Sequence, residues 1–188
     1  MKAVVLNGFH AGDPLRELLQ ENVETVLRDA GWDIKLFMLS EMTIRPCQGD
    51  FQCWIKTPGK CMYRDTHAVM QAMIQSQMVF MLTPVTFGGY SSELKKMVDH
   101  FIPYILPFFT SIDGETHHAQ RYAQHFHLRA IGVMDKPDAH EKNIFQRLVA
   151  RNAINVAAQS IATEVLLRKD VRERAAHGVQ ALLPEKVM

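Results

Sequence analysis

The sequence predicts an α/β protein whose doubly wound parallel sheet has five strands, with helices on both faces. Short apolar runs alternate five times with segments whose apolar residues recur at helical spacing, and strict β–α alternation is typical of parallel sheets. Glycine-containing turns follow the first and third predicted strands, over 7–12 and 85–90. Because parallel strands end at one edge of the sheet, these turns are expected at a ligand-binding edge. We expect residues 1–188 to form a single domain.

The first predicted unit is a buried strand over 2–6, followed by a helix that begins at Asp13 and the proline after it. Asp is a favoured N-cap, and Pro is favoured at the first helical position. One apolar stripe runs along this helix, and Gly31 ends it. A second strand is predicted over 33–39, where apolar residues alternate.

The rest of the chain continues the alternation after a long loop over 41–64. The helix after this loop is expected to begin at Asp65 or Thr66. Residues 102–126 are expected to be irregular because prolines interrupt them. The remaining strands are predicted over 78–82, 128–133 and 161–167, and the remaining helices over 66–74, 91–101, 137–153 (with Ile144, Leu148 and Val149 on one apolar face) and 171–183.

Composition and charge exclude several classes of function. The net charge is +1, with 47% hydrophobic and 22% charged residues, so electrostatics favours neither nucleic acid nor an acidic membrane as a partner. No apolar run reaches the roughly 20 residues that a membrane span needs. The apolar start of the chain is interrupted by Asn7-Gly8, unlike a signal peptide. We therefore expect a cytoplasmic protein.

The most informative stretch reads MVFMLTPVTFGGYSSELKKMVDHF and runs from Met78 to Phe101. It predicts a buried strand, a glycine turn and a helix that begins at Ser91. Its glycines let the backbone approach a ligand, and the ring of Phe87 is free to stack on one. The stretch resembles the T-P-V-x-F/W-G-x-x-S turn that contacts the flavin in flavodoxin-like NAD(P)H-dependent FMN reductases and iron–sulfur flavoproteins. The resemblance implies strand order 2-1-3-4-5 and FMN contacts at Pro84, Val85, Thr86, Phe87 and Gly88.

The turn after the first strand is the expected site of the FMN phosphate, with Phe9, His10, Gly12 and Asp13 as candidate binding residues. A helix start offers unpaired N–H groups and about half a unit of positive charge. The family's version, G-S-P-R-x-x-G-N-T, is richer in hydroxyl and basic residues, and only the glycines match. Asp13 has the wrong sign for a phosphate, and His10 is the only side chain in the turn that offsets it. For this turn taken alone, a helix cap without a ligand is the alternative.

The loop over 46–61 resembles the family segment P-C-x-G-C-x-x-C-W-x-K-T-P-G-x-C. In iron–sulfur members, four thiolates hold a cluster. Here Asp50 stands in the place of the second cysteine, so we expect no iron–sulfur centre and assign no metal ligand. Three roles for the cysteines remain open: a structural or incidental role is favoured first, a redox-active thiol second and a zinc site third. The cysteines are Cys47, Cys53 and Cys61, and Trp54 is expected to pack the loop or to border the flavin pocket.

An aromatic stretch over 101–109 is too apolar to lie in water. The segment around it resembles the one that forms the dimer interface and the wall over the flavin in relatives. The resemblance implies a homodimer, and an internal flap is the alternative. The charged residues over 168–174 and the Lys95-Lys96 pair are expected to form solvated faces.

The resemblance implies an FMN-dependent oxidoreductase, in which NAD(P)H reduces the flavin and the flavin passes electrons to a small-molecule electron acceptor. A quinone, a nitro compound, free flavin and an azo dye are all candidate acceptors. The flavin performs the redox chemistry, and the sequence shows no Ser/His/Asp set or carboxylate pair, so catalytic residues are left unassigned. The alternatives are a flavin-binding electron carrier without a dedicated substrate and a fold relative that has lost the cofactor.

Overall fold

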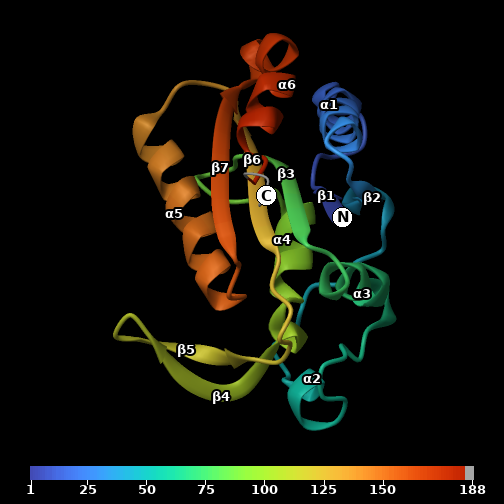
Figure 1. Ribbon diagram of the computed structural model, residues 1–188, viewed down its shortest axis with the longest axis vertical. Coiled ribbons are helices and arrows are strands. Elements are labelled where there is room, and N and C mark those ends of the chain that lie inside the picture. Colours follow the sequence, from blue (N-terminus) through green and yellow to red (C-terminus); the bar gives the residue numbers. More distant parts are fainter. Residues whose placement is uncertain (185–188) are drawn as a thin grey trace.

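The computed structural model of the protein describes residues 1–184, and its centre is a parallel sheet. Five strands form this sheet in the order β2-β1-β3-β6-β7 (Figure 1). Counted along the chain within the sheet, this order is 2-1-3-4-5, so the predicted topology is confirmed. The strands are β1 (Lys2–Asn7), β2 (Asp33–Met38), β3 (Met78–Pro84), β6 (His127–Met134) and β7 (Ser160–Leu167).

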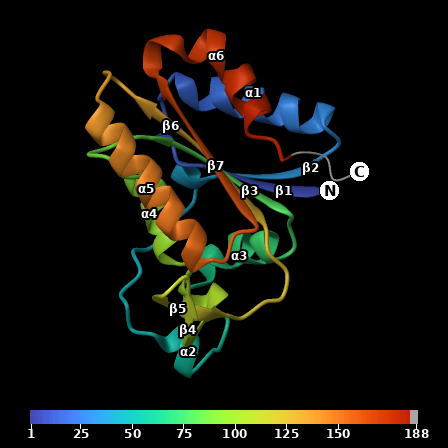
Figure 2. The same ribbon diagram turned by 60° about the vertical axis from the view of Figure 1, so that its left-hand side comes forward.

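Helices cover both faces of the sheet. Two of them, α1 (Leu15–Asp29) and α6 (Val171–Ala181), pack side by side on one face. The opposite face is covered by α3 (His67–Ile74), α4 (Ser92–Asp99) and α5 (Ala139–Asn155), as Figure 2 shows. Shorter elements are α2 (Gln52–Ile55), η1 (Leu39–Glu41), η2 (Arg64–Thr66), η3 (Ile102–Tyr104) and η4 (Arg168–Asp170).

The central strand β3 is a continuous apolar run from Met78 to Leu82, and its burial on both faces explains this. In a parallel sheet both faces are buried, so each residue of a central strand needs an apolar side chain. Val79 and Met81 pack among the helices α3, α4 and α5, whereas Phe80 and Leu82 pack beneath α1 and α6. All four are at most 1% exposed. The period of two along a strand distributes them between the two cores.

One helical expectation was wrong. In α5 the buried apolar residues are Phe145, Val149 and Ala153, whereas the side chain of Ile144 is 41% exposed. Consecutive residues of a helix point about 100° apart. Since Phe145 faces the core, Ile144 is rotated out of it.

Residues 102–126 are more regular than the prolines suggested. They contain an antiparallel hairpin of β4 (Ile105–Ile112) and β5 (Glu115–Gln120), which forms a separate two-stranded sheet. Pro107 cannot donate a ladder hydrogen bond, and the pairing is irregular between Ile105 and Phe109, around this proline. The missed signal is Asp113-Gly114, both at positive φ, which is a typical two-residue hairpin turn.

The hairpin and the cysteine loop lie together at the end of the molecule beyond the carboxyl end of α4 (Figures 1 and 2). The turns at 8–13 and 83–90 lie just before the first residues of α1 and α4, so the hairpin and the 83–90 turn are at opposite ends of α4. Among residues 1–184, no helix combines the length and the apolar character that crossing a membrane requires.

Candidate functional site

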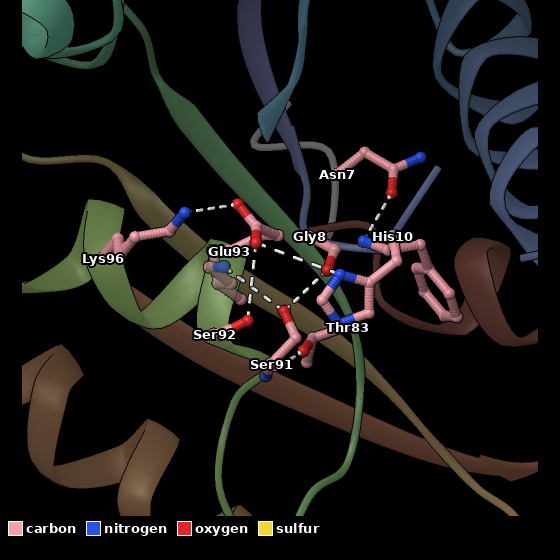
Figure 3. Close-up of polar contacts among 10 residues, drawn as sticks. Asn7, Gly8, His10, Thr83, Ser91, Ser92, Glu93 and Lys96 are labelled. Carbon is pink, nitrogen blue, oxygen red and sulfur yellow. Dashed lines mark hydrogen bonds and ion pairs between the residues drawn. The ribbon is translucent and has the colours of Figure 1, made fainter. Parts of the chain in front are cut away.

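The turns after β1 and β3 meet at the carboxyl edge of the sheet, and Ser91 joins them. Its hydroxyl donates to the carbonyl oxygen of Gly8 at 2.6 Å, and its N–H donates to the Thr83 hydroxyl at 2.9 Å (Figure 3). The same hydroxyl accepts from the N–H of Leu94 at 3.2 Å, which caps α4. Ser91 is 1% exposed. One buried side chain therefore holds the two expected ligand turns in a common position.

Gly8 is needed because the two turns approach so closely. A Cβ atom at this position would lie 2.7 Å from the Cβ of Leu94 and 2.9 Å from the Ser91 hydroxyl oxygen. The N–H of Gly8 donates to the carbonyl oxygen of Leu82 at 2.8 Å. The absence of a side chain thus lets the first turn pack directly on the start of α4.

The first turn presents backbone donors. The side chain of Phe9 is fully buried beneath α1 and α6, so only its backbone faces the turn. His10, Ala11 and Gly12 are exposed, and Gly12 has φ +88°. Within the part of the chain that the structure describes, the N–H groups of these three residues have no protein acceptor. Adjacent free N–H groups before a helix fit a phosphate.

The charge of Asp13 is balanced by a residue that the sequence analysis placed on a solvated face. Arg168, from η4, donates to both carboxylate oxygens of Asp13, at 2.9 and 3.0 Å, and to Asp135 at 2.7 Å. Burial alone would raise the pKa of Asp13, but hydrogen bonds from Arg168 and Leu15 outweigh it and lower that pKa. The expectation that Arg168 is a solvated charge was wrong, whereas the charge of His10, the group expected to offset Asp13 within the turn, also lowers the pKa of Asp13.

His10 lies on the other side of the turn, near α4. Its Nδ1 is 3.9 Å from a carboxylate oxygen of Glu93, and Lys96 holds the second oxygen at 2.7 Å (Figure 3). The charge of the Glu93 carboxylate is thus already compensated by Lys96, without the longer contact to His10. His10 is 59% exposed at its side chain, so it is available to a ligand.

The turn after β3 holds an aromatic ring out into solvent. Thr86 and Gly89 exchange two backbone hydrogen bonds, and the residues between them, Phe87 and Gly88, have φ of 51° and 73°. Left-handed backbone at both central positions is a type I′ turn, which favours Asn or Gly and is costly for a bulky residue. Phe87 is 97% exposed. Among residues 1–184, the ring of Phe87 thus gains little packing that would offset this conformation, and its faces are accessible to a planar ligand.

The base of this turn is anchored to the neighbouring elements. Pro84 ends β3, and the N–H of Val85 donates to the carbonyl oxygen of Val133 at 2.8 Å. The N–H of Gly88 donates to a carboxylate oxygen of Glu141, in the first turn of α5, at 3.0 Å. A Cβ atom on Gly88 would lie 2.7 Å from Ile144. The role of Glu141 was missed, because its partner lies 53 residues away.

The cysteine loop forms a separate cluster. All three thiols line one cavity of about 20 Å³ together with Asp50 and His100, and the sulfur of Cys61 lies 3.5 Å from Nδ1 of His100. Burial raises the pKa of Cys53 to about 11, and the neighbouring Cys61 and Cys47 add to this shift. A thiol with a raised pKa is protonated at neutral pH and is a weak nucleophile. Among residues 1–184, no three His, Cys, Asp or Glu side chains are placed to hold a metal ion.

Trp54 packs the cysteine loop onto the hairpin. Its indole N–H donates to the carbonyl oxygens of Ile102 and Ile105, both at 3.0 Å. Its ring stacks on Phe51 at 5.1 Å and lies 4.9 Å from the ring of His118. Of the two roles expected for Trp54, the structure shows the first, packing of the loop.

Two hollows of about 400 and 480 Å³ adjoin this loop, away from the turns at the sheet edge, and share Lys60, Cys61 and His67.

The comparisons with known proteins agree with this geometry. The sequence model of the family described as NADPH-dependent FMN reductase matches residues 1–162, and the chain belongs to this family. An iron–sulfur flavoprotein of Methanocaldococcus jannaschii is 26% identical over 109 residues, which cover 57% of this chain and 55% of that protein. The match thus spans about half the length of the curated relative. The predicted resemblance is confirmed.

Solved structures confirm the flavodoxin-like fold. The NAD(P)H:quinone oxidoreductase from Methanothermobacter marburgensis superposes with a TM-score of 0.69 at 13% identity, covering 96% of this chain and 94% of that one. An FMN-dependent NADH-azoreductase from Bacillus anthracis, in complex with FMN, gives 0.60 at 10% identity, covering 96% of both chains. The class that the sequence analysis predicted, an FMN-dependent oxidoreductase, is the class for which the matched family is named.

Proposed function

We propose that this protein is a cytoplasmic, single-domain FMN-dependent NAD(P)H oxidoreductase that passes electrons to a small acceptor such as a quinone, a nitro compound or free flavin. The observation that carries the proposal is the meeting of two ligand-competent turns through Ser91, in a chain of the FMN reductase family. FMN supplies the redox chemistry when it is bound, and the protein binds and orients it.

The residues of the two turns fit FMN. The free N–H groups of His10, Ala11 and Gly12 suit its phosphate, and the exposed ring of Phe87 suits a planar heterocycle. Phe9 contributes through its backbone, because its side chain is buried. The proposed binding residues are Phe9, His10, Gly12, Asp13, Pro84, Val85, Thr86, Phe87 and Gly88.

A homodimer is part of the proposal. In the aromatic stretch, Phe101 and Tyr104 are buried in the core, whereas Phe108 and Phe109 are 66% and 70% exposed. Phe51 and Ile55 of the adjoining loop are 45% and 74% exposed. An isolated two-stranded hairpin is marginally stable in water. A second copy of the chain is the proposed cover for this surface, because twofold dimers are the commonest arrangement.

One observation favours the electron-carrier alternative. Within one chain, the 83–90 turn precedes α4 and the hairpin follows it, so the hairpin does not cover Phe87, which is 97% exposed. An open flavin edge suits electron transfer to a protein partner. A reductase needs a wall that holds nicotinamide on the flavin, and in the proposed dimer the partner's hairpin would supply it.

Two measurements test the proposal. The absorbance spectrum of the purified protein is expected to show flavin, and FMN at a hundredfold excess over its dissociation constant is expected to add about 2.7 kcal/mol of stability. Oxidation of NADH and NADPH is then measured with quinone, nitro, flavin and azo acceptors. A colourless protein whose thermal midpoint is unchanged by FMN contradicts the proposal. Bound FMN without NAD(P)H oxidation supports the carrier instead.

A further inference from the structure

We propose that Arg168 compensates the carboxylate of Asp13 at the FMN phosphate site and offers its remaining N–H groups to the phosphate. This inference rests on the proposed FMN function. It concerns a residue beyond 162, where the match to the family ends.

The first step is the position of Arg168 beside the turn. It lies in η4, between β7 and α6, and 155 residues from Asp13 in sequence. The packing of α6 against α1 brings the start of α6 to the start of α1 (Figure 2). The two bonds to Asp13 form a planar fork, which fixes the guanidinium more firmly than one bond would.

The second step is the hydrogen-bonding capacity that remains. A guanidinium has five N–H donors. Arg168 uses one at Nε for Asp135 and one at each terminal nitrogen for Asp13. One N–H on each terminal nitrogen therefore remains for a ligand, and the side chain is 34% exposed. Arginine is well suited to this arrangement because its planar fork also matches phosphate.

The third step is the charge balance at the turn. Asp13 also accepts from the N–H of Leu15 at 2.9 Å, so its carboxylate stays at the start of α1. Without Arg168, this carboxylate would face the phosphate uncompensated. Arg168 compensates the charge of Asp13, whereas its second partner, the Asp135 carboxylate, is 77% exposed at its side chain and is screened by water. The free N–H groups of 10–12 then have no uncompensated carboxylate of Asp13 beside them. Two other cations near the turn, Arg16 and Lys96, are already paired with Glu41 and Glu93.

The experiment compares FMN with riboflavin, which lacks the phosphate. Dissociation constants of both flavins are measured by fluorescence titration for wild type, Arg168→Gln, Asp13→Asn and Arg174→Gln. Arg174 is the matched control because it lies on α6, is 57% exposed at its side chain and pairs with Glu164 rather than with the turn. Thermal unfolding checks that each variant is folded. Asn at position 13 keeps a side-chain oxygen for the N–H of Leu15.

The expected result is specific to the phosphate. Arg168→Gln is expected to weaken FMN binding about tenfold or more and to leave riboflavin binding within about twofold, because only FMN meets the uncompensated carboxylate. Asp13→Asn is expected to bind FMN more tightly than wild type, since Arg168 then keeps its charge for the ligand. Arg174→Gln is expected to resemble wild type with both flavins.

The outcomes separate this inference from the proposed function. Equal weakening of FMN and riboflavin in Arg168→Gln overturns the inference, because it indicates a general structural role. An unchanged ratio of the two constants, or the same ratio change in Arg174→Gln, overturns it as well. Wild-type protein that binds neither flavin overturns the proposed function and this inference with it, whereas wild-type binding of FMN alone or of both flavins leaves the function standing.

Discussion

The hydroxyl of Ser91 donates a 2.6 Å hydrogen bond to the carbonyl oxygen of Gly8, 83 residues away in sequence. This contact connects the turn after β1 to the first residue before α4 and is fully shielded from water, since Ser91 is 1% exposed. It converts two separate local motifs into one site. Together with the bond from the Gly8 N–H to the Leu82 carbonyl oxygen, it fixes the position of the first turn relative to the start of α4.

Ser91→Ala is expected to destabilise the protein by about 2–3 kcal/mol. Loss of an N-cap costs about 1 kcal/mol, and leaving a buried carbonyl unpaired costs about 1–3 kcal/mol. Urea unfolding measures the change in free energy, and FMN binding is expected to weaken in parallel. Ser92→Ala is the control, because Ser92 is exposed and caps no helix. A loss below about 0.5 kcal/mol in Ser91→Ala contradicts this role.

Phe87→Asn is expected to change stability and binding in opposite directions. Asn tolerates the left-handed backbone of a type I′ turn better than Phe does, so the free energy of unfolding is expected to rise by a few tenths of a kcal/mol, up to about 1 kcal/mol. FMN affinity is expected to fall about threefold to tenfold as stacking is lost. Urea unfolding and flavin titration measure the two effects. Lower stability together with unchanged FMN affinity would show that the ring serves the fold.

The buried tyrosines are expected to make the protein sensitive to alkali. Burial raises the pKa of Tyr90 to about 12, an effect larger than the opposing bond from Asn152. The unfolded chain ionises near pH 10, so this stabilisation is complete below pH 10 and is lost as the pH rises toward 12. The slope per tyrosine is at most about 1.4 kcal/mol per pH unit.

Tyr90→Phe is therefore expected to show a shallower loss of stability above pH 10 than wild type, measured by urea unfolding across the alkaline range. Tyr104 gives an independent check, because burial also raises its pKa to about 12. Tyr104→Phe is expected to act in the same direction. An unchanged alkaline slope in both variants contradicts the assignment.

The protein is expected to contain no four-iron cluster. Asp50, in the place of the second cysteine, accepts from the N–H of Gln52 at 3.1 Å at the start of α2. Analysis of iron and acid-labile sulfide in anaerobically purified protein tests this expectation, and stoichiometric amounts of both contradict it. The single variants Cys47→Ser, Cys53→Ser and Cys61→Ser are each expected to keep the flavin content of wild type.

The double substitution Phe108→Asp with Phe109→Asp is expected to shift the protein from dimer to monomer and to lower reductase turnover. Burying a large apolar side chain is worth roughly 1.5–3 kcal/mol, and charges at an apolar interface oppose association. Light scattering at micromolar concentration measures the mass. Both residues are exposed in the single chain, so the fold itself is expected to persist. A monomeric wild type contradicts the dimer.

Local sequence patterns determined the framework of the molecule. Apolar runs and helical stripes predicted all five strands of the sheet and their connecting helices, because period and capping are properties of neighbouring residues. Motif resemblance then supplied the strand order and the flavin turn. The hairpin was also encoded locally, by Asp113-Gly114, but the prolines of the segment drew attention away from it.

Tertiary structure alone decided which side chains complete the site. The pairing of Arg168 with Asp13 spans 155 residues, and that of Gly88 with Glu141 spans 53. Such contacts depend on which strands are neighbours and on which helices share a face, and the spacing of residues along the chain does not specify either. The sequence by itself therefore identified the two turns and their residue types, whereas the balance of charge around Asp13 followed only from the packing of α6 against α1.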